Sequence, residues 1–453
     1  MWEVEHKNYG KGKIIKKRFG GFEIYVEFED GIQRWVRKDD VKFLPEGALE
    51  KTESSESITS SSKYILSDEQ FKAREIIESL RLGIVPYKYV EEFTFGRERE
   101  IERIVNWLHD SKEGALAIVG KYGAGKTHIL EYIYSLALKN NWAVSKVEID
   151  PNEASFHTPN TIYQKITRSF RFKISNDDYG DFREFLRQIS FHPDSRSLHD
   201  HKYLGIAIKK IKKGEDDEDF WGWIEGEKQS AYRTYPYSMY KHSACGSIYS
   251  YILSGIGWSA TNILGLNGFL ILFDEAEVDI IDPPWYTSYK DDKAWSFLSG
   301  IILMANNDER LLNESVEPKF YYSWDTPAYI GNETKLHYCG HLRYLGFVWE
   351  IPCHVKIIFN LTEIFEREPL NNIPRIELYH IHKNSLMDIS KAIFELYQGA
   401  YGLQLNNVQL SHIFDLISKD NTRLFIKGMV EALDLIRFHP SKPLKTLLNL
   451  RRR

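Results

Sequence analysis

The chain has 453 residues, a formal net charge of −5 and 27% charged residues. This length allows two or three domains with substantial cores, and the slightly acidic balance excludes a wholly basic nucleic-acid binder, so any contact with nucleic acid must be local. Only three cysteines, no signal pattern and no membrane-length apolar stretch together predict a cytoplasmic protein without disulfides or membrane contact.

Residues 1–45 predict a small β-barrel. Segments of strand-like composition are separated by tight glycine turns, at residues 13–15, 22–28 and 33–36. Five short strands of this kind resemble an SH3-like or Tudor module, which implies a nucleic-acid or polymerase partner. Basic residues cluster here, and either a phosphate-contacting patch or a solvated basic hairpin would have this composition: Lys7, Lys11, Lys13, Lys16, Lys17 and Arg18.

The segment 46–64 is rich in Ser and Glu and of low complexity, which predicts a flexible linker. Ser67 and Gln70 form a capping-box pair that predicts the start of a helix. A further helix begins near Arg97. We expect residues 65–370 to form one α/β domain with a parallel sheet.

A phosphate-binding loop is the strongest feature of the chain. Residues 120–127 fit G-x-x-x-x-G-K-[ST], a P-loop (Walker A) pattern in which backbone N–H groups surround a phosphate, Lys126 reaches the β/γ-phosphates and Thr127 ligates Mg²⁺. An apolar run at 115–119 predicts the strand before the loop, and helical spacing of apolar residues predicts a helix after it. The residues expected to bind ATP are Gly120, Lys121, Tyr122, Gly123, Ala124, Gly125, Lys126, Thr127 and His128.

A second segment, 268–275, is an apolar strand that ends in two carboxylates. We expect this strand to lie beside the P-loop strand, with its ligands at the carboxyl edge of the sheet. Asp274 would hold Mg²⁺ through water, and Glu275 would orient or deprotonate the attacking water. An ordinary core strand followed by a solvated acidic turn would have the same composition.

A third strand is predicted at 354–360, between the two motifs in the sheet. Asn360 is our first choice and Thr362 the second for a residue that senses the γ-phosphate or holds the lytic water. An Asn that satisfies a turn is the alternative. The long chain between Thr127 and Gly268 predicts one strand at 143–150, followed by helices and an insertion.

Residues 371–453 predict three helices, which we interpret as an α-helical lid or a winged helix. Arg423 opens the last of these helices, where it would touch the γ-phosphate from the lid side. A surface arginine that balances Asp434 or Glu431 is the alternative.

A group of potential zinc ligands lacks the spacing of a zinc site. His337, Cys339 and His341 alternate, and Cys353 and His354 follow, but neither C-x-x-C nor a matched pair occurs. We therefore expect no metal site there.

Several stretches together resemble the BREX-type ATP-binding family, whose relatives accompany phage-defence systems: 74–86, 95–104, the P-loop, 268–277 and 421–434. The resemblance extends from about residue 65 to the end, and the family is similar to the origin-recognition branch of AAA+ ATPases. It implies that Phe95, Gly96 and Arg97 line the adenine pocket and that Arg423 is the lid sensor. It also implies a homo-oligomer, with Arg367 or Arg375 as the finger that reaches a neighbouring subunit.

These features predict an ATP-hydrolysing protein of AAA+ type that acts with DNA and a partner helicase or nuclease, in antiviral defence or DNA processing. The alternatives are an ATP-dependent switch with slow turnover and an adaptor whose N-terminal module captures a protein.

Overall fold

A computed structural model describes residues 3–446 except 7–8, 19–22, 30, 38–40, 45–66, 85–86, 111–112, 151, 176–177, 228–234, 236, 238, 240–245, 277–288, 313–315, 324–325, 335–346, 364–369 and 444. The chain divides into two units, residues 1–67 and 68–453. The predicted linker at 46–64 lies outside the described residues.

The first unit is a five-stranded antiparallel sheet with the order β4-β3-β2-β1-β5. Its strands are β1 (Glu3–His6), β2 (Gly10–Arg18), β3 (Glu23–Phe28), β4 (Gln33–Arg37) and β5 (Val41–Leu44). Alternate side chains form its core, because successive residues of a strand point to opposite faces: Val4, Ile14, Ile24, Val26, Phe28 and Val36. Closure of these strands into a barrel stays a prediction.

The second unit is built on a five-stranded parallel sheet with the order β14-β6-β13-β10-β7. Its strands are β6 (Ala115–Val119), β7 (Ala143–Glu148), β10 (Phe269–Asp274), β13 (Val355–Leu361) and β14 (Arg375–Glu377). Strand β13 lies between β6 and β10, as predicted for the third strand. The acidic strand β10 therefore does not lie beside the P-loop strand β6, contrary to our expectation. The carboxyl ends of β6, β13 and β10 meet at one edge.

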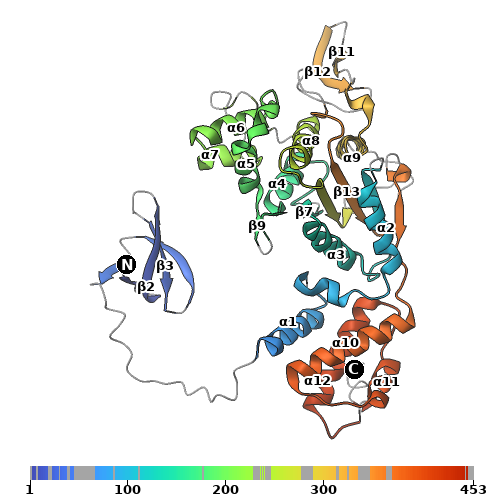
Figure 1. The fold of residues 1–453 in the computed structure, drawn as a ribbon. Helices are drawn as coiled ribbons and strands as arrows, with labels where there is room; N and C mark the ends of the chain where they lie inside the picture. The colour runs from blue at the N-terminus through green and yellow to red at the C-terminus, as the bar shows by residue number, and fades with distance from the viewer. Residues whose placement is uncertain are drawn as a thin grey trace. The chain divides into compact units, whose positions relative to one another are not determined.

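Helices cover both faces of this sheet (Figure 1). Helices α2 (Glu98–His109) and α3 (Lys126–Lys139) pack on one face, against side chains such as Ile118 and Leu272. Helices α4 (Pro159–Ser169), α8 (Gly246–Asn262) and α9 (Tyr289–Ala305) pack on the other face, against the alternate residues of the same strands. The strands are apolar on both faces because both are buried.

Two insertions lengthen the chain between the strands. Between β7 and β10, beside α4 and α8, lie β8 (Phe172–Lys173), β9 (Tyr179–Gly180), α5 (Phe182–Phe191), α6 (Leu204–Lys213) and α7 (Glu218–Ile224). Between β10 and β13, after α9, lies the hairpin of β11 (Val316–Ser323) and β12 (Thr326–Thr334). The first insertion was predicted from the chain length, whereas the hairpin was not.

The segment predicted to be a lid forms a four-helix cluster with the first helix of the unit, and we call this cluster the lid. Helices α10 (Lys383–Tyr401), α11 (Asn407–Leu416) and α12 (Thr422–Phe438) share one apolar core with α1 (Asp68–Leu82). Arg81 of α1 donates to Asp434 of α12 over 2.9 Å. The sequence assigned α1 to the α/β domain, but its apolar residues contact α10 and α12 (Figure 1).

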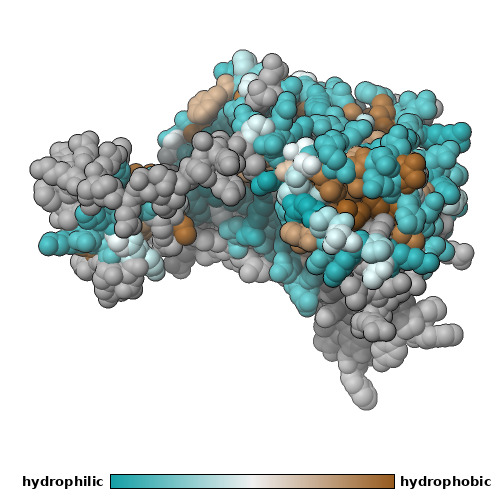
Figure 2. Space-filling model, turned by 90° about the horizontal axis from the view of Figure 1, so that it is seen from below, coloured by the Kyte–Doolittle hydropathy of each residue, from teal (hydrophilic) through white to brown (hydrophobic). Residues whose placement is uncertain are grey.

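The surface seen in Figure 2 is mostly hydrophilic, with one apolar area among polar residues. Lid helices contribute exposed apolar side chains, which include Phe71, Leu82 and Leu424 at 62% exposure each. Within the residues that the structure describes, no helix has both the length and the apolarity that crossing a membrane requires.

Candidate nucleotide-binding site

The loop between β6 and α3 has a backbone that only glycine adopts easily. Gly123 and Gly125 have φ of 82° and 94°, in the left-handed region that side chains disfavour. Gly125 is the N-cap of α3, and no side chain caps the helix there. The first N–H groups of α3 are therefore available to an anion, toward which the helix dipole points.

The ammonium of Lys126 lies over this loop. Its Nζ donates to the carbonyl oxygen of Gly120 over 2.9 Å and to the hydroxyl of Thr362 over 3.3 Å. Thr362 follows β13 directly, so Lys126 bridges the P-loop and the end of the central strand. Phosphate oxygens could replace these two neutral acceptors, since charge-assisted hydrogen bonds are the stronger ones.

A residue of β13 positions the carboxylate at the end of β10. The carboxylate of Asp274 is 5% exposed, and its Oδ1 accepts from Asn360 Nδ2 over 2.5 Å and from the backbone N–H of Glu275 over 3.1 Å. Asn360 is fully buried, and its Oδ1 has no hydrogen-bond partner among the described residues. Asn360 therefore orients Asp274 rather than lining the cavity.

A lysine that the sequence analysis missed lies near the carboxylate of Asp274. Lys146 of β7 places its Nζ 4.0 Å from Asp274 Oδ2 and forms an ion pair with Glu131 of α3. Glu148, two residues along β7, pairs in register with Asp274 and lines the cavity. Charged residues in an otherwise apolar strand were the signal available from the sequence.

Glu275 has a strained backbone at the end of β10. Its φ is 52°, in the left-handed region, which costs a residue with a side chain on the order of 1–3 kcal/mol. The buried strand before it and the hydrogen bond from its N–H to Asp274 hold this conformation. The side chain is exposed and lines the cavity, as a group that meets water or substrate must.

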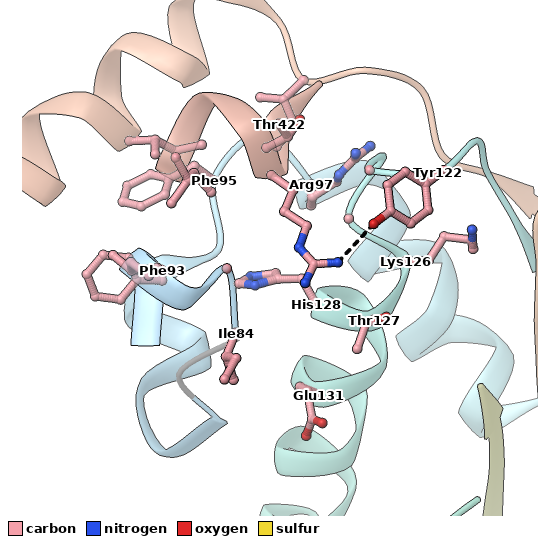
Figure 3. A pocket seen from close by; sticks show the side chains of 18 of the residues that line it. Ile84, Phe93, Phe95, Arg97, Tyr122, Lys126, Thr127, His128, Glu131 and Thr422 are labelled. Atoms are coloured by element: carbon pink, nitrogen blue, oxygen red, sulfur yellow. Dashed lines mark hydrogen bonds between the residues drawn. The ribbon is translucent and has the colours of Figure 1, made fainter. Parts of the chain in front are cut away.

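A cavity of about 790 Å³ joins these elements to the lid. Ligand sites of small molecules have roughly 300–1,000 Å³. Figure 3 shows Lys126 and Thr127 on one side of it and Ile84, Phe93 and Phe95 on the other. One end is polar and the other apolar, and the apolar lining comprises Leu80, Ile84, Phe93, Phe95, Ile381, Ile389, Ile393 and Ile426.

Arg97 joins the two ends. Its guanidinium is 4% exposed and donates to the carbonyl oxygens of Ala124 over 2.5 Å and of Tyr379 over 2.8 Å, and it pairs with Glu100 over 2.9 Å. The guanidinium of Arg97 thus links the P-loop to the segment after β14. Arg97 lines the cavity, but its N–H groups donate to protein acceptors, the carbonyl oxygens of Ala124 and Tyr379 and the carboxylate of Glu100.

His128 lies between the polar and apolar ends. Its Nε2 is 2.8 Å from the hydroxyl of Thr94. Burial, and the positive charge of Arg97, lower the pKa of the His128 imidazole to about 4. The ring is therefore neutral at physiological pH.

The lid contacts the P-loop directly. Arg423 of α12 donates to the hydroxyl of Tyr122 over 3.1 Å, the bond dashed in Figure 3. Asn421, the N-cap of α12, donates to the carbonyl oxygen of Tyr122 over 3.4 Å. These two hydrogen bonds join the start of α12 to the P-loop.

Most of the predicted site residues line this one cavity: Phe95, Arg97, Tyr122, Gly123, Gly125, Lys126, Thr127, His128, Asp274, Glu275 and Arg423, with Thr362. Others are not in its lining, namely Gly96, Gly120, Lys121, Ala124 and Asn360. Gly96 approaches Ser385 of α10 instead, so closely that a Cβ would lie 2.5 Å from the hydroxyl oxygen.

Two sets of predicted residues fall elsewhere. Arg375 begins β14, and its carbonyl oxygen accepts from Arg103 over 3.0 Å. Cys353 is buried and donates to the carbonyl oxygen of Met304 over 3.2 Å, and burial raises the pKa of its thiol to about 12. Outside the described residues lie Arg367, His337, Cys339 and His341.

The sequence analysis also missed the source of the apolar end. Helix α1 contributes Leu80, Ile84 lies two residues beyond the end of α1, and Phe93 ends a 3₁₀ helix at Tyr87–Phe93. The apolar periodicity of α1 and of the lid helices was visible, but it does not tell which residues turn toward a cavity.

The residues present fit a magnesium–phosphate group. No group of three or more His, Cys, Asp or Glu positioned for a metal occurs among the described residues. Mg²⁺ in nucleotide sites needs only one or two protein carboxylates or hydroxyls, because water and phosphates supply the rest. Thr127 and Asp274 line the same cavity, and the uncapped start of α3 offers the amides for the phosphates.

Comparison with known proteins agrees with the resemblance drawn from the sequence. Residues 69–189 match the family model described as BREX system ATP-binding protein BrxC/D. The match includes the P-loop and the segment 95–97, and it ends before the acidic strand and most of the lid. No curated protein matches the chain. The match supports ATP binding and a connection with BREX defence.

Proposed function

We propose that this protein binds and hydrolyses MgATP. The observation that carries the proposal is that Lys126 and Thr127, which follow β6, line one cavity together with Asp274 and Glu275 at the end of β10. These are the group types that phosphoryl transfer to water requires, namely a cation, a metal ligand and a base.

Each residue has a distinct role in the proposal. The amides of the loop and Lys126 bind the phosphates, and Asp274 with Thr127 would hold Mg²⁺, which when bound neutralises charge on the phosphate oxygens. Glu275 orients the attacking water and takes its proton. Asn360 keeps Asp274 in place through the 2.5 Å hydrogen bond, and Thr362 is the polar group of β13's end that faces the nucleotide.

The class of ATPase is also part of the proposal. The placement of β13 between the P-loop strand and the acidic strand, and a helical lid that supplies Arg423, support an AAA+-like protein. The family match supports a role in phage defence. We infer that the protein works in the cytoplasm as a homo-oligomer, with DNA and a helicase or nuclease as partners, and with Arg375 or Arg367 reaching a neighbouring subunit.

The test compares binding with turnover. Glu275→Gln should keep ATP affinity within a few fold and lose turnover by roughly 10²–10⁴-fold, the usual contribution of a positioned base. Glu309→Gln, an exposed glutamate outside the cavity, is the matched control and should hydrolyse normally. Normal hydrolysis by Glu275→Gln would contradict the assignment. Assays with and without single- and double-stranded DNA, read beside particle mass with and without ATP, test the partner and oligomer proposals.

A switch is the second candidate. The contacts of Arg423 and Asn421 with Tyr122 favour it, because they join lid position to the state of the loop. A switch predicts nucleotide that copurifies tightly, slow turnover and no response to DNA. An adaptor role predicts instead that deletion of residues 1–45 abolishes capture of a protein partner.

A further inference from the structure

The apolar end of the cavity suits the apolar face of a nucleotide base but cannot by itself choose between purines. Its lining is aliphatic and aromatic (Figure 3). Such a surface stacks on adenine, guanine and hypoxanthine alike, since every base has an apolar face. Discrimination needs a polar atom that meets one edge of the base, because a mispaired polar group is costly in a closed site.

His128 supplies a polar atom at this place. The ring lies on the side of α3 that faces Phe93 and Ile84, away from Lys126 (Figure 3). Its Nε2 is occupied by Thr94, whereas its Nδ1 has no hydrogen-bond partner among the described residues. Nδ1 is thus the atom of this ring that is available to a ligand.

The neighbouring hydroxyl determines the tautomer of the ring. Thr94 Oγ1 donates its one hydrogen to the carbonyl oxygen of Val90 over 2.7 Å. The contact of Thr94 Oγ1 with His128 Nε2 over 2.8 Å must then be donated by the ring. In the neutral imidazole the proton is on Nε2, and Nδ1 carries the lone pair. His128 therefore presents an acceptor to the cavity and no donor.

We propose that His128 Nδ1 accepts a hydrogen bond from the 6-amino group of adenine and so selects ATP over triphosphates of 6-oxopurines. Adenine carries a donor at position 6, whereas hypoxanthine and guanine carry an acceptor there. The oxygen of a 6-oxopurine would face the Nδ1 lone pair, which leaves two acceptors opposed. The inference rests on the proposed function, because it assigns the base edge of the same nucleotide.

The first experiment needs no variant. Dissociation constants of the full chain for MgATP and MgITP are measured by calorimetry, since inosine differs from adenosine at position 6 and the adjoining N1 alone. We expect ATP to bind at least about tenfold more tightly, the effect of one unpaired buried polar contact. Equal affinities would overturn the inference while leaving ATP binding intact. Failure of both nucleotides to bind would overturn the proposed function and the inference with it.

Variants then locate the selectivity. His128→Leu keeps the volume and removes the acceptor, so the ratio of ITP to ATP dissociation constants should fall to near one. Ile84→Ala is the matched control, which removes apolar contact and should weaken both nucleotides by the same factor. A ratio unchanged in His128→Leu would overturn the role of His128.

A second variant acts through the tautomer. Thr94→Val removes the acceptor for the Nε2 proton at nearly constant volume, so the ring loses its fixed tautomer and orientation. We expect a ratio between those of the wild type and His128→Leu, with ATP still bound. A wild-type ratio in Thr94→Val would overturn the tautomer argument. The Thr94→Val variant also tests the proposal if His128→Leu fails to fold.

Discussion

The two ends of the cavity are built in different ways. The polar end, where we propose that the phosphates bind and which we call the phosphate end, comes from the ends of β6, β7, β10 and β13 and from the start of α3, all inside the α/β core. The apolar end comes from α1, from the segment before α2, and from lid helices α10 and α12. Helices α1 and α10 are separated by about 300 residues of the chain. The chemistry of the site thus depends on short motifs, whereas its closure depends on packing between distant helices.

Because the two ends are built from separate cores, we expect substitutions at one end to leave the other intact. The sheet supports Asp274 through Asn360, within a core that does not involve the lid. The lid has its own apolar core and contacts the P-loop through Tyr122. Changes at the phosphate end should therefore abolish turnover with the fold intact, while changes in the apolar core of the lid should alter affinity and stability first.

The largest expected effect on activity is at the phosphate end. Lys126→Ala removes the ammonium that would neutralise the γ-phosphate, and turnover should fall by roughly 10²–10³-fold. The unfolding midpoint should stay close to that of the wild type, because the side-chain hydrogen bonds of Lys126 within the described part of the chain are those to Gly120 and Thr362. Lys391→Ala, an exposed lid lysine, is the control and should keep full activity. A steady-state phosphate-release assay decides it.

The largest expected effect on stability is in the lid. Ile76 of α1 is fully buried, and Ile76→Ala should lower the free energy of unfolding by roughly 2–5 kcal/mol. Phe71→Ala, on the same helix at 62% exposure, should change it by less than about 0.5 kcal/mol.

Tryptophan fluorescence separates the lid from the core in this experiment. Segments 68–93 and 371–453 contain no tryptophan, so its emission reports the core and the first unit but not the lid. Ile76→Ala should shift the circular-dichroism transition of the helices to lower denaturant before the fluorescence transition. Coincident transitions in the variant would show that the two ends unfold as one unit, which would contradict the expectation that they fail separately.

A smaller effect on turnover is expected at Arg423, where the lid contacts the P-loop. Arg423→Ala removes the hydrogen bond to Tyr122 and a positive charge at the cavity. Turnover should fall by about tenfold, one lost charge-assisted contact, with ATP affinity within a few fold. Leu424→Ala, the exposed neighbour, should leave both unchanged. If affinity falls as much as turnover, Arg423 binds the ground state rather than sensing hydrolysis.

The smallest expected effect is on the pH dependence of stability, and it arises from a histidine buried in the core. Burial lowers the pKa of His201 to about 3, and its Nδ1 accepts from the backbone N–H groups of Tyr203 and Leu204. Between about pH 6.5 and 3 the unfolded chain binds a proton that the folded chain does not, so the free energy of unfolding falls as pH falls.

His201→Asn tests this dependence, because Asn keeps an acceptor for the two N–H groups without titrating. The loss of stability between pH 7 and 5.5, followed by tryptophan fluorescence, should shrink by about 1 kcal/mol. His199→Asn, an exposed neighbour, should leave the pH dependence as it is. An unchanged dependence in His201→Asn would place the acid sensitivity at other residues.

The phosphate end could be predicted from the sequence because each of its parts is local. Glycines with positive φ, a lysine at the start of a helix and carboxylates after an apolar run depend on a few neighbouring residues. Asn360 was singled out for the same reason, as a polar residue late in a strand between the two motifs, and its predicted role as a γ-phosphate sensor stays a prediction. Its buried contact with Asp274, rather than with the cavity, was not predictable, since it depends on the register of two strands.

The residue pattern predicted the P-loop, the acidic strand end, the insertion and the helical character of the lid segment. The folded chain was needed to learn that α1 joins the lid, that Arg97 donates to Ala124 and Tyr379, and that the His128 ring faces the apolar end with no partner for Nδ1 among the described residues. The physical reason is that backbone conformation and period follow from adjacent residues, whereas side-chain packing between segments hundreds of residues apart depends on how the whole core closes.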